Sequence, residues 1–272
     1  MIIWLASYPK SGNTWLRAFL SYYCYGKVGE FNFKLLENIK KFPDIKDLKD
    51  LNINYLDTSE LIKNWSPLQD YINLKKEMTF LKTHNALCTI NNYSFANSKS
   101  SIGAIYILRD PRDVIISLSN HFNKTLEETL EIMLSDSFWE TETKFKNFHS
   151  SIFGSWANNY RSWKNTNIFD SLIIRYEDMI QDPFNTFSKI IKYIEKKTTI
   201  SFDEALIRKT IELTSFKNLQ NKENIGEFKE TAHGKFFRKG EINQWKKNLP
   251  NKILKKLEDS FSDVMFENKY LL

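Results

Sequence analysis

The chain has 272 residues, enough to bury the core of one large domain, and its 21 Phe, 12 Tyr and 7 Trp exclude a disordered protein. Its net charge of +6 suits three kinds of partner: nucleic acid, an acidic polymer or a phosphorylated small molecule. Cys24 and Cys88 are too few for a disulfide scaffold and lack the spacing of a zinc site, so a reducing compartment fits best.

Strand patterns alternate with helical patterns along the chain. Short apolar runs predict buried strands at Ile2–Ser7, Thr79–Thr83, Gly103–Leu108 and Leu172–Arg175. Helical spacing begins near Asn13 and at Pro111, and it returns over residues 151–163, 183–194, 202–213 and 251–261. This order predicts an α/β fold with a central parallel sheet flanked by helices.

Residues 1–272 are predicted to form a single domain, because no repeat, proline-rich linker or low-complexity segment divides them. The stretch around 26–76 has helical patches and no convincing strand, so we interpret it as an insertion that covers the C-terminal edge of the sheet and shapes a substrate pocket. The apolar start lacks a preceding basic segment, and no later run reaches the length of a membrane span. We therefore expect a cytoplasmic protein.

The first predicted strand ends in a polar turn, Tyr8-Pro9-Lys10-Ser11-Gly12-Asn13-Thr14-Trp15, that runs directly into a helix. The turn lacks the first glycine and the Gly-Lys order of a Walker A loop, so it is not an ordinary ATP loop. It does place a glycine, two hydroxyls and a lysine at a helix N-terminus, where free backbone N–H groups and the helix dipole favour anions. The alternative interpretation is a structural turn with a surface lysine.

The second predicted strand ends in Lys82-Thr83-His84, at the edge where active sites of parallel sheets lie. Lys82 and His84 are two residues apart and can point the same way, and a histidine can accept a proton from a hydroxyl at neutral pH. The other three histidines are interpreted as structural or merely exposed: His121, His149 and His233.

The third predicted strand is followed by Arg109, whose guanidinium can clamp a phosphate, and by Ser117 one turn into the next helix. Asp110 also resembles the Mg²⁺-holding aspartate of phosphoryl-transfer enzymes, which keeps a P-loop kinase open as an alternative.

A basic turn, Phe237-Arg238-Lys239-Gly240, lies near the C-terminus and could bind a second phosphate. A basic surface loop is the plainer interpretation, and a non-enzymatic module that binds nucleic acid or acidic polymers remains a third hypothesis. The lysine runs are interrupted by acidic or apolar residues, which favours solvated helix faces over a nucleic-acid patch.

Taken together and in this order, the motifs resemble those of the PAPS-dependent sulfotransferases of the cytosolic type, in a bacterial-like form; PAPS is 3′-phosphoadenosine 5′-phosphosulfate. The resemblance runs from Trp4 to about Trp245, and it includes Arg175-Tyr176-Glu177-Asp178 and Thr214-Ser215-Phe216 as further donor-site segments. It implies a P-loop-like sulfotransferase fold, no metal, and PAPS as a co-substrate that leaves as 3′-phosphoadenosine 5′-phosphate (PAP). It also implies an acceptor that is a small molecule or saccharide with a hydroxyl or amine, and no nucleic acid partner.

The resemblance assigns a role to each matching residue. Lys10 would neutralise the bridging oxygen, Lys82 would support the sulfuryl group in transit, and His84 would deprotonate the acceptor. The remaining matches would bind the donor: Ser11, Gly12, Asn13 and Thr14 at the 5′-phosphate; Arg109, Ser117, Arg238, Lys239 and Gly240 at the 3′-phosphate; Trp15, Tyr176 and Phe216 around the adenine; and Thr214, Ser215 and Phe237 in the supporting segments.

The chain departs from the family pattern in three places. Asn13 replaces a common threonine, and Asn243 and Gln244 stand where the family has a second glycine and an acidic residue. The short dimerisation motif of many animal cytosolic members is not evident after Trp245, so their dimer is not carried over and the oligomeric state is left unassigned.

Overall fold

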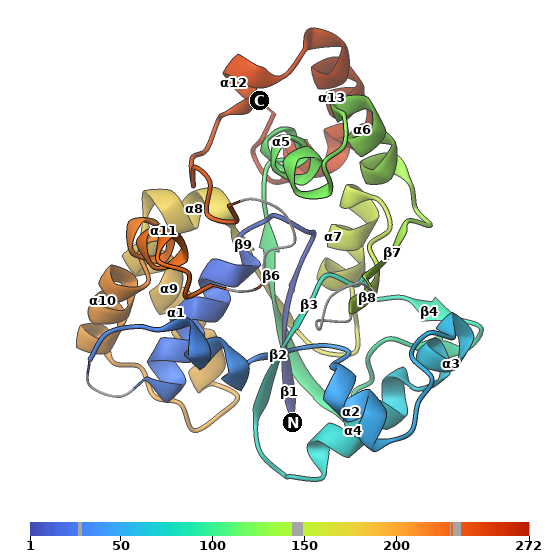
Figure 1. Cartoon of the computed structure of the whole chain (residues 1–272), viewed down its shortest axis with the longest axis vertical. Coiled ribbons are helices and arrows are strands. Elements are labelled where there is room, and N and C mark those ends of the chain that lie inside the picture. Colours follow the sequence, from blue (N-terminus) through green and yellow to red (C-terminus); the bar gives the residue numbers. More distant parts are fainter. Residues whose placement is uncertain (27–28, 143–148, 229, 231–234, 272) are drawn as a thin grey trace.

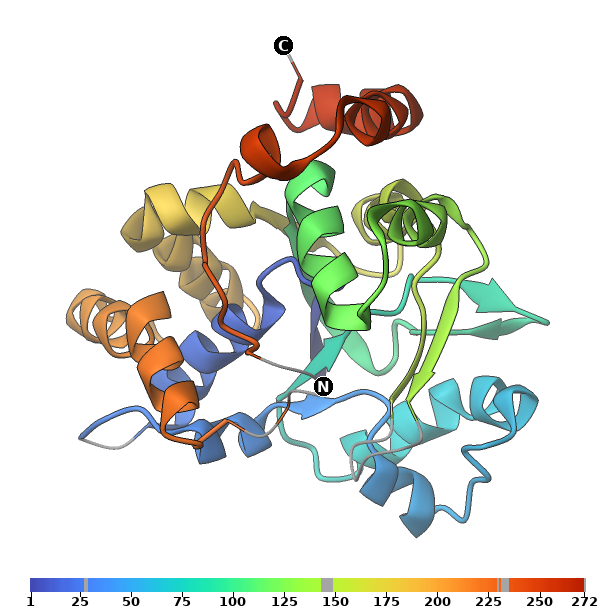
Figure 2. The ribbon, with the colours of Figure 1, turned by 45° about the horizontal axis from the view of Figure 1, so that its top comes forward.

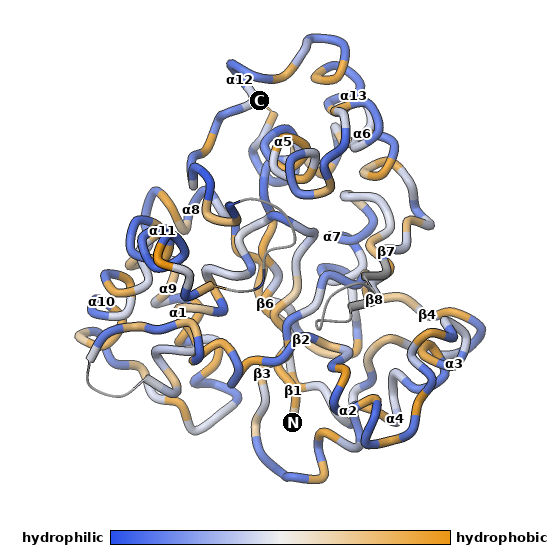
Figure 3. Tube along the Cα trace, in the orientation of Figure 1, coloured by the Kyte–Doolittle hydropathy of each residue, from blue (hydrophilic) through white to orange (hydrophobic). Residues whose placement is uncertain are grey.

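A five-stranded parallel sheet forms the centre of the computed structural model, which describes residues 1–26, 29–142, 149–228, 230 and 235–271 (Figure 1). The strand order is β2 (Lys40–Lys41), β3 (Thr79–Thr83), β1 (Ile2–Ser7), β6 (Ser101–Leu108) and β9 (Ser171–Arg175), and each neighbouring pair is parallel. The predicted parallel sheet and its four apolar strands are confirmed. The fifth strand, β2, was not predicted because it has two residues and both are lysines, so it shows as a hydrophilic stretch beside the apolar strands (Figure 3).

Helices cover both faces of the sheet, and the period-two alternation of β1 divides its side chains between them. Ile3 and Leu5 pack in the core under one layer, whereas Trp4 packs in the core under the other. The first layer contains α1 (Asn13–Tyr25), α9 (Pro183–Glu195), α10 (Glu204–Leu213) and α11 (Phe216–Asn224). The second contains α4 (Trp65–Asn73), α5 (Pro111–Phe122), α7 (Trp156–Lys164) and α13 (Asn251–Glu267). Burial on both faces explains why the central strands are continuously apolar.

Shorter elements complete the chain: η1 (Phe33–Asn38), α2 (Ile45–Asp50), α3 (Thr58–Lys63), β4 (Thr89–Ile90), β5 (Tyr93–Ser94), α6 (Leu126–Leu134), β7 (Trp139–Glu142), β8 (His149–Ile152), α8 (Tyr176–Gln181) and α12 (Trp245–Asn248). The helix predicted from residue 151 begins later, because residues 149–152 pair with β7 and Gly154 adopts a positive φ of 61°. Ser155 then caps α7 by accepting from the Asn158 amide.

The short helices between residues 29 and 76 divide between the two core layers: η1 packs in the first, whereas α2, α3 and α4 pack in the second. Trp65 of α4 packs edge-on against Phe95, with ring centroids 5.2 Å apart, and Phe95 in turn lies 5.3 Å from Trp4 in the middle of β1. Within the described residues, no helix combines the length and the apolar character needed to cross a bilayer.

The stretch from Phe236 to Trp245 crosses the carboxyl ends of the strands on its way from α11 to α12 (Figure 2). It brings residues from the last part of the sequence over the turns that follow β1 and β6.

Candidate active site

The turn between β1 and α1 has the geometry of an anion-binding loop. Lys10 and Gly12 adopt positive φ angles of 65° and 102°, and α1 begins at Asn13. A Cβ on Gly12 would lie 2.5 Å from the Tyr176 ring, so only glycine fits at this position. Asn13 fixes the loop to β1, because its side-chain amide donates to the Leu5 carbonyl at 2.9 Å. The N–H groups of the first turn of α1 therefore face the same space as the lysine.

Arg109 follows β6 and connects three separate parts of the site. Its guanidinium donates to the Lys10 carbonyl at 3.0 Å and to the Glu241 carbonyl at 3.2 Å. It also stacks over the Tyr176 ring, 4.4 Å from the centroid, and only 7% of the residue is exposed. A buried guanidinium held in one orientation is suited to bidentate recognition of a phosphate.

The basic turn near the C-terminus is held by α11. Glu223 accepts from the backbone N–H groups of Phe236 and Phe237 at 2.6 and 2.9 Å, and Gln220 donates to the Phe237 carbonyl at 2.7 Å. Gly240 has a φ of 67°, and a Cβ there would overlap the Phe216 ring at 2.5 Å. These contacts fix the backbone on which Arg238 and Lys239 lie.

His84 follows β3, and its orientation indicates which of its two ring nitrogens carries the hydrogen. Its Nδ1 lies 2.9 Å from the Ser7 carbonyl oxygen, and a carbonyl can only accept, so Nδ1 carries the hydrogen. In the neutral ring Nε2 is then the unprotonated nitrogen, the one that can accept a proton. The backbone of His84 is held as well, because the Asn159 amide donates to its carbonyl at 3.0 Å.

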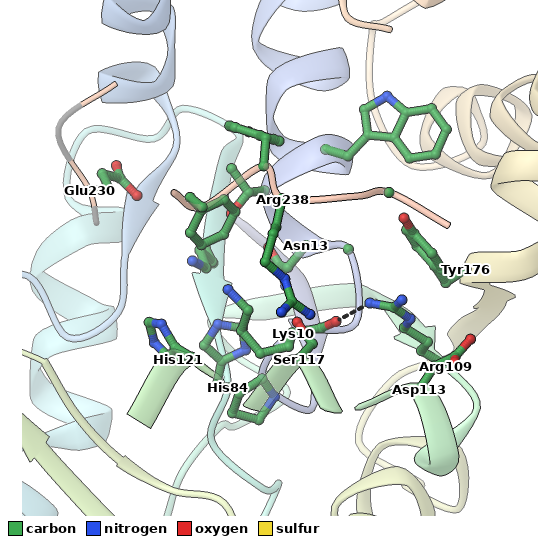
Figure 4. Close-up of a pocket in the computed structure, with 18 of the residues that line it drawn as sticks. Lys10, Asn13, His84, Arg109, Asp113, Ser117, His121, Tyr176, Glu230 and Arg238 are labelled. Atoms are coloured by element: carbon green, nitrogen blue, oxygen red, sulfur yellow. Dashed lines mark hydrogen bonds between the residues drawn. The ribbon is translucent and has the colours of Figure 1, made fainter. Parts of the chain in front are cut away.

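A single cavity of about 720 Å³ brings these four segments together (Figure 4). The predicted site residues that line it are Lys10, Gly12, Asn13, Thr14, Trp15, Lys82, His84, Arg109, Ser117, Tyr176, Phe216, Phe237, Arg238, Lys239 and Gly240. Ser11, Thr214 and Ser215 do not line it. Ser11 is buried within the loop, and the Thr214 hydroxyl donates to the Thr210 carbonyl at 2.7 Å.

Burial, together with neighbouring positive charge, lowers the pKa values of two lysines in the cavity. Burial, followed by the charges of Arg109 and Arg238, lowers the pKa of Lys10 to about 8. Burial, followed by the charge of Lys41, lowers the pKa of Lys82 to about 7. Both amines therefore titrate near neutral pH, and an anionic ligand that enters the cavity would favour their charged forms.

A charged cluster at the cavity wall was not predicted from the sequence. Glu230 accepts from Arg17 at 2.7 and 2.9 Å and lies 3.3 Å from the Lys41 ammonium; Glu230 and Lys41 both line the cavity. Burial alone would raise the pKa of Glu230, but the charges of Arg17, Lys41 and Lys82 lower it to about 2. Arg17 lies within the apolar pattern of α1 and Lys41 in the lysine pair of β2, so neither position carried a recognisable motif.

The histidines other than His84 differ in their positions. His121, interpreted from the sequence as structural or merely exposed, lines the cavity from the last turn of α5. His149 belongs to β8, and His233 lies outside the described residues.

Asp110 does not face the cavity as a metal-holding aspartate would. It is the N-cap of α5, and its carboxylate accepts from the Arg112 guanidinium at 2.8 to 3.2 Å. It is 5% exposed and is absent from the cavity lining. The carboxylate is thus committed to a structural ion pair, which removes the residue on which the kinase alternative depends.

The residues of the cavity fit a ligand with two phosphate ends. Within the part of the chain that the structure describes, Ser11 Oγ and Arg109 Nε are buried without a hydrogen-bond partner. Both belong to segments that the resemblance assigns to phosphate binding; Arg109 lines the cavity, and Ser11 is buried in the loop beside it. Gly12 and Gly240 leave space where any side chain would intrude.

Comparison with known proteins agrees with this geometry. Residues 2–269 match the family described as the sulfotransferase domain. The chain is 26% identical over 269 residues to flavonol 3-sulfotransferase of Flaveria bidentis, covering 94% of this chain and 79% of that relative. It is 24% identical over 273 residues to amine sulfotransferase of Oryctolagus cuniculus, covering 97% and 80%.

The fold is also that of a solved sulfotransferase. Mouse sulfotransferase SULT7A1 complexed with PAP superimposes with a TM-score of 0.60 at 20% identity, over 97% of this chain and 84% of that one. Since the family match spans nearly the whole chain and Asp110 is not available to a metal, the kinase alternative is set aside. The protein belongs to the sulfotransferase domain family, whose enzymes use PAPS as the sulfuryl donor.

Proposed function

We propose that this enzyme transfers the sulfuryl group of PAPS, by in-line displacement, to a hydroxyl or amine of a small-molecule or saccharide acceptor. The observation that supports the proposal best is the shared cavity, which is lined by a candidate base, His84, together with several cationic side chains. The family match supports the chemistry, and the acceptor classes in the names of the two relatives, a flavonol and an amine, fit the proposed acceptor groups.

The two ends of the donor would be held by different segments. The N–H groups of residues 11–14 would bind the 5′-phosphate, while Arg109, Ser117 and the 238–240 turn would bind the 3′-phosphate. The aromatic rings of Trp15, Tyr176 and Phe216 would surround the adenine. Thr214 and Ser215 would act through the backbone that presents Phe216, since the Thr214 hydroxyl is engaged in its own helix.

When bound, PAPS supplies a sulfuryl group whose bond to the bridging phosphate oxygen breaks as the acceptor atom bonds to sulfur. His84 Nε2 takes the acceptor proton, because the Ser7 carbonyl holds the hydrogen on Nδ1. Lys10 neutralises the charge that develops on the bridging oxygen, and Lys82 stabilises the sulfuryl oxygens. Positioned cations of this kind lower the barrier most when the site excludes water.

A product assay tests the proposal directly. The protein is incubated with PAPS and separate acceptors (a phenol, a phenolic amine, an alkyl amine and a hexose), and PAP and sulfated product are measured by mass spectrometry. We expect sulfated product in equal amount to PAP with at least one acceptor, and tighter binding of PAP than of ATP in calorimetry. Phosphorylated product with ATP and Mg²⁺, or binding that is indifferent to the nucleotide and falls steeply with salt, would instead favour the kinase or the nucleic-acid module.

A further inference from the structure

Asp113 is an acidic residue that lines the cavity on the same side as Arg109 (Figure 4). It lies in the first turn of α5, and only 2% of it is exposed. Its two oxygens have different partners: Oδ2 accepts from the backbone N–H of Asn243 at 2.7 Å, and Oδ1 accepts from that of Trp245 at 3.0 Å. Both oxygens of this buried carboxylate therefore hold the main chain of one segment that is distant in sequence.

The segment that Asp113 holds is the continuation of the basic turn. Only two residues separate the 238–240 turn from Asn243. The start of the turn is fixed from the other side by α11, through the contacts that Gln220 and Glu223 make with its backbone. A turn that is fixed at both ends keeps one conformation, so less conformational entropy is lost when a ligand binds to it.

Two other contacts join the same end of α5 to this segment. Arg109, which precedes the helix, donates to the Glu241 carbonyl at 3.2 Å. The Arg112 guanidinium lies over the Trp245 ring, 3.9 Å from its centroid. The contacts of Asp113 differ from these because a charged oxygen accepts directly from the backbone, and charge-assisted hydrogen bonds of this kind are stronger than neutral ones.

We propose that Asp113 is a positioning residue for recognition of the 3′-phosphate of the donor: its carboxylate fixes the segment after Gly240, and the fixed segment holds the 238–240 turn where that phosphate would bind. The inference rests on the proposed function, because it takes PAPS as the ligand of the cavity.

Charge and position lead to opposite expectations for Asp113. On charge alone a carboxylate repels a phosphate, so removal of the carboxylate should strengthen the binding of the donor. If Asp113 acts through the backbone that it holds, its removal should weaken binding, and only for ligands that carry the 3′-phosphate. The sign of the change in affinity therefore separates the two roles.

Asp113→Asn tests the inference by comparing two nucleotides in calorimetry. The amide keeps the size of the side chain, but its nitrogen cannot accept, so one of the two backbone N–H groups loses its acceptor. PAP carries the 3′-phosphate and AMP does not, so the ratio of their Kd values reports the contribution of that phosphate. We expect PAP affinity to fall about tenfold or more and AMP affinity to stay within about twofold of the wild type. Asp113→Ser, which is smaller and retains a single acceptor, should change both affinities in the same way and serves where the amide variant does not fold.

Asp57→Asn is the matched control. The Asp57 carboxylate also accepts from two backbone N–H groups, those of Ser59 and Glu60 at 2.8 and 3.2 Å, but it is not among the described residues that line the cavity. It should leave both affinities unchanged. Hydrogen exchange adds a measurement without ligand: the amides of Asn243 and Trp245 should exchange faster in Asp113→Asn than in the wild type, and at the wild-type rate in Asp57→Asn.

Unchanged or stronger PAP binding in Asp113→Asn would overturn the inference, because it would show that the carboxylate does not act through the backbone. An equal loss for PAP and AMP would overturn it as well, since that result indicates a general loss of structure, and so would unchanged exchange at the two amides. These results would leave the proposed function in place. Wild-type protein that binds PAP no better than AMP would instead refute the proposed donor site, and the inference with it.

Discussion

The contact between Gly12 and Tyr176 gives a prediction whose size follows from the structure. In Gly12→Ala the new Cβ would lie 2.5 Å from the ring, at a φ of 102° that alanine rarely adopts. The backbone strain costs about 1–2 kcal/mol, and the overlap costs about 1–3 kcal/mol more. The ring has little freedom to move away, because Tyr176 is 4% exposed and Arg109 stacks on it. We therefore expect a loss of about 2–5 kcal/mol in the free energy of unfolding.

Gly226→Ala provides a matched control. Gly226 has a similar positive φ of 82°, but a Cβ there would meet no atom within 4 Å. It should show the strain alone, a loss of about 1–2 kcal/mol. The difference between the two variants in urea unfolding then isolates the contact with Tyr176.

Donor binding should separate the two variants further. A displaced Tyr176 shifts Arg109 as well as the loop, so Gly12→Ala should weaken PAP binding in calorimetry at least tenfold, or about 1.4 kcal/mol. Gly226→Ala should bind PAP as the wild type does. Equal stability and equal PAP affinity in the two variants would refute the argument that the loop closes on the Tyr176 ring.

Three other predictions follow from the site. His84→Gln keeps a donor for the Ser7 carbonyl but removes the base, so turnover should fall about 10²–10⁴-fold while PAP affinity is retained; unchanged turnover would exclude His84 as the base. The value of kcat/KM should decline as pH rises through about 7 to 8, because Lys82 and Lys10 lose their protons there, with pKa values lowered to about 7 and about 8. A value of kcat/KM that stays constant up to about pH 10, where ordinary lysines titrate, would contradict this. PAP at about 100 times its Kd should raise the melting temperature by about 5–10 °C, and AMP at the same concentration should raise it less, since it lacks the phosphate that Arg109 and Arg238 would bind; equal shifts would argue against a 3′-phosphate site.

Short-range sequence patterns predicted most of the fold and the part of the site that follows β1 and β6. A buried strand, a tight turn and a helix N-terminus are consecutive in the chain after both β1 and β6, so the positions of Lys10 and Arg109 followed from short-range patterns. The donor-site segments farther along were assigned through resemblance, and the structure brings Tyr176 and the 237–240 turn to the same cavity.

The remaining part of the site depends on tertiary contacts. Glu230 is placed by Arg17 and Lys41, and the strand that carries Lys41 exists only because β3 offers an edge for two lysines to pair with. Neither hydropathy nor spacing reports such a contact. The segment around 26–76 illustrates the same limit, because hydropathy does not report where its elements pack. From this segment Lys41 and Phe42 reach the cavity, and α2, α3 and α4 pack into the core that contains Trp4.

The departures from the family pattern show which requirements belong to the backbone and which to the side chain. Asn243 stands where the family has a glycine, and it adopts a φ of 62°, a conformation that asparagine tolerates better than most residues. Its N–H donates to Asp113 at 2.7 Å, and Asp113 also accepts from the Trp245 amide at 3.0 Å, so the turn keeps its anchor without the glycine. Asn13 likewise replaces a hydroxyl with an amide that ties the loop to the Leu5 carbonyl. In both places the turn is held by contacts that this chain supplies: the Asn243 N–H through Asp113, and the Asn13 side chain through Leu5. A consensus letter can therefore change where another contact, or a residue that tolerates the same backbone conformation, stabilises the turn.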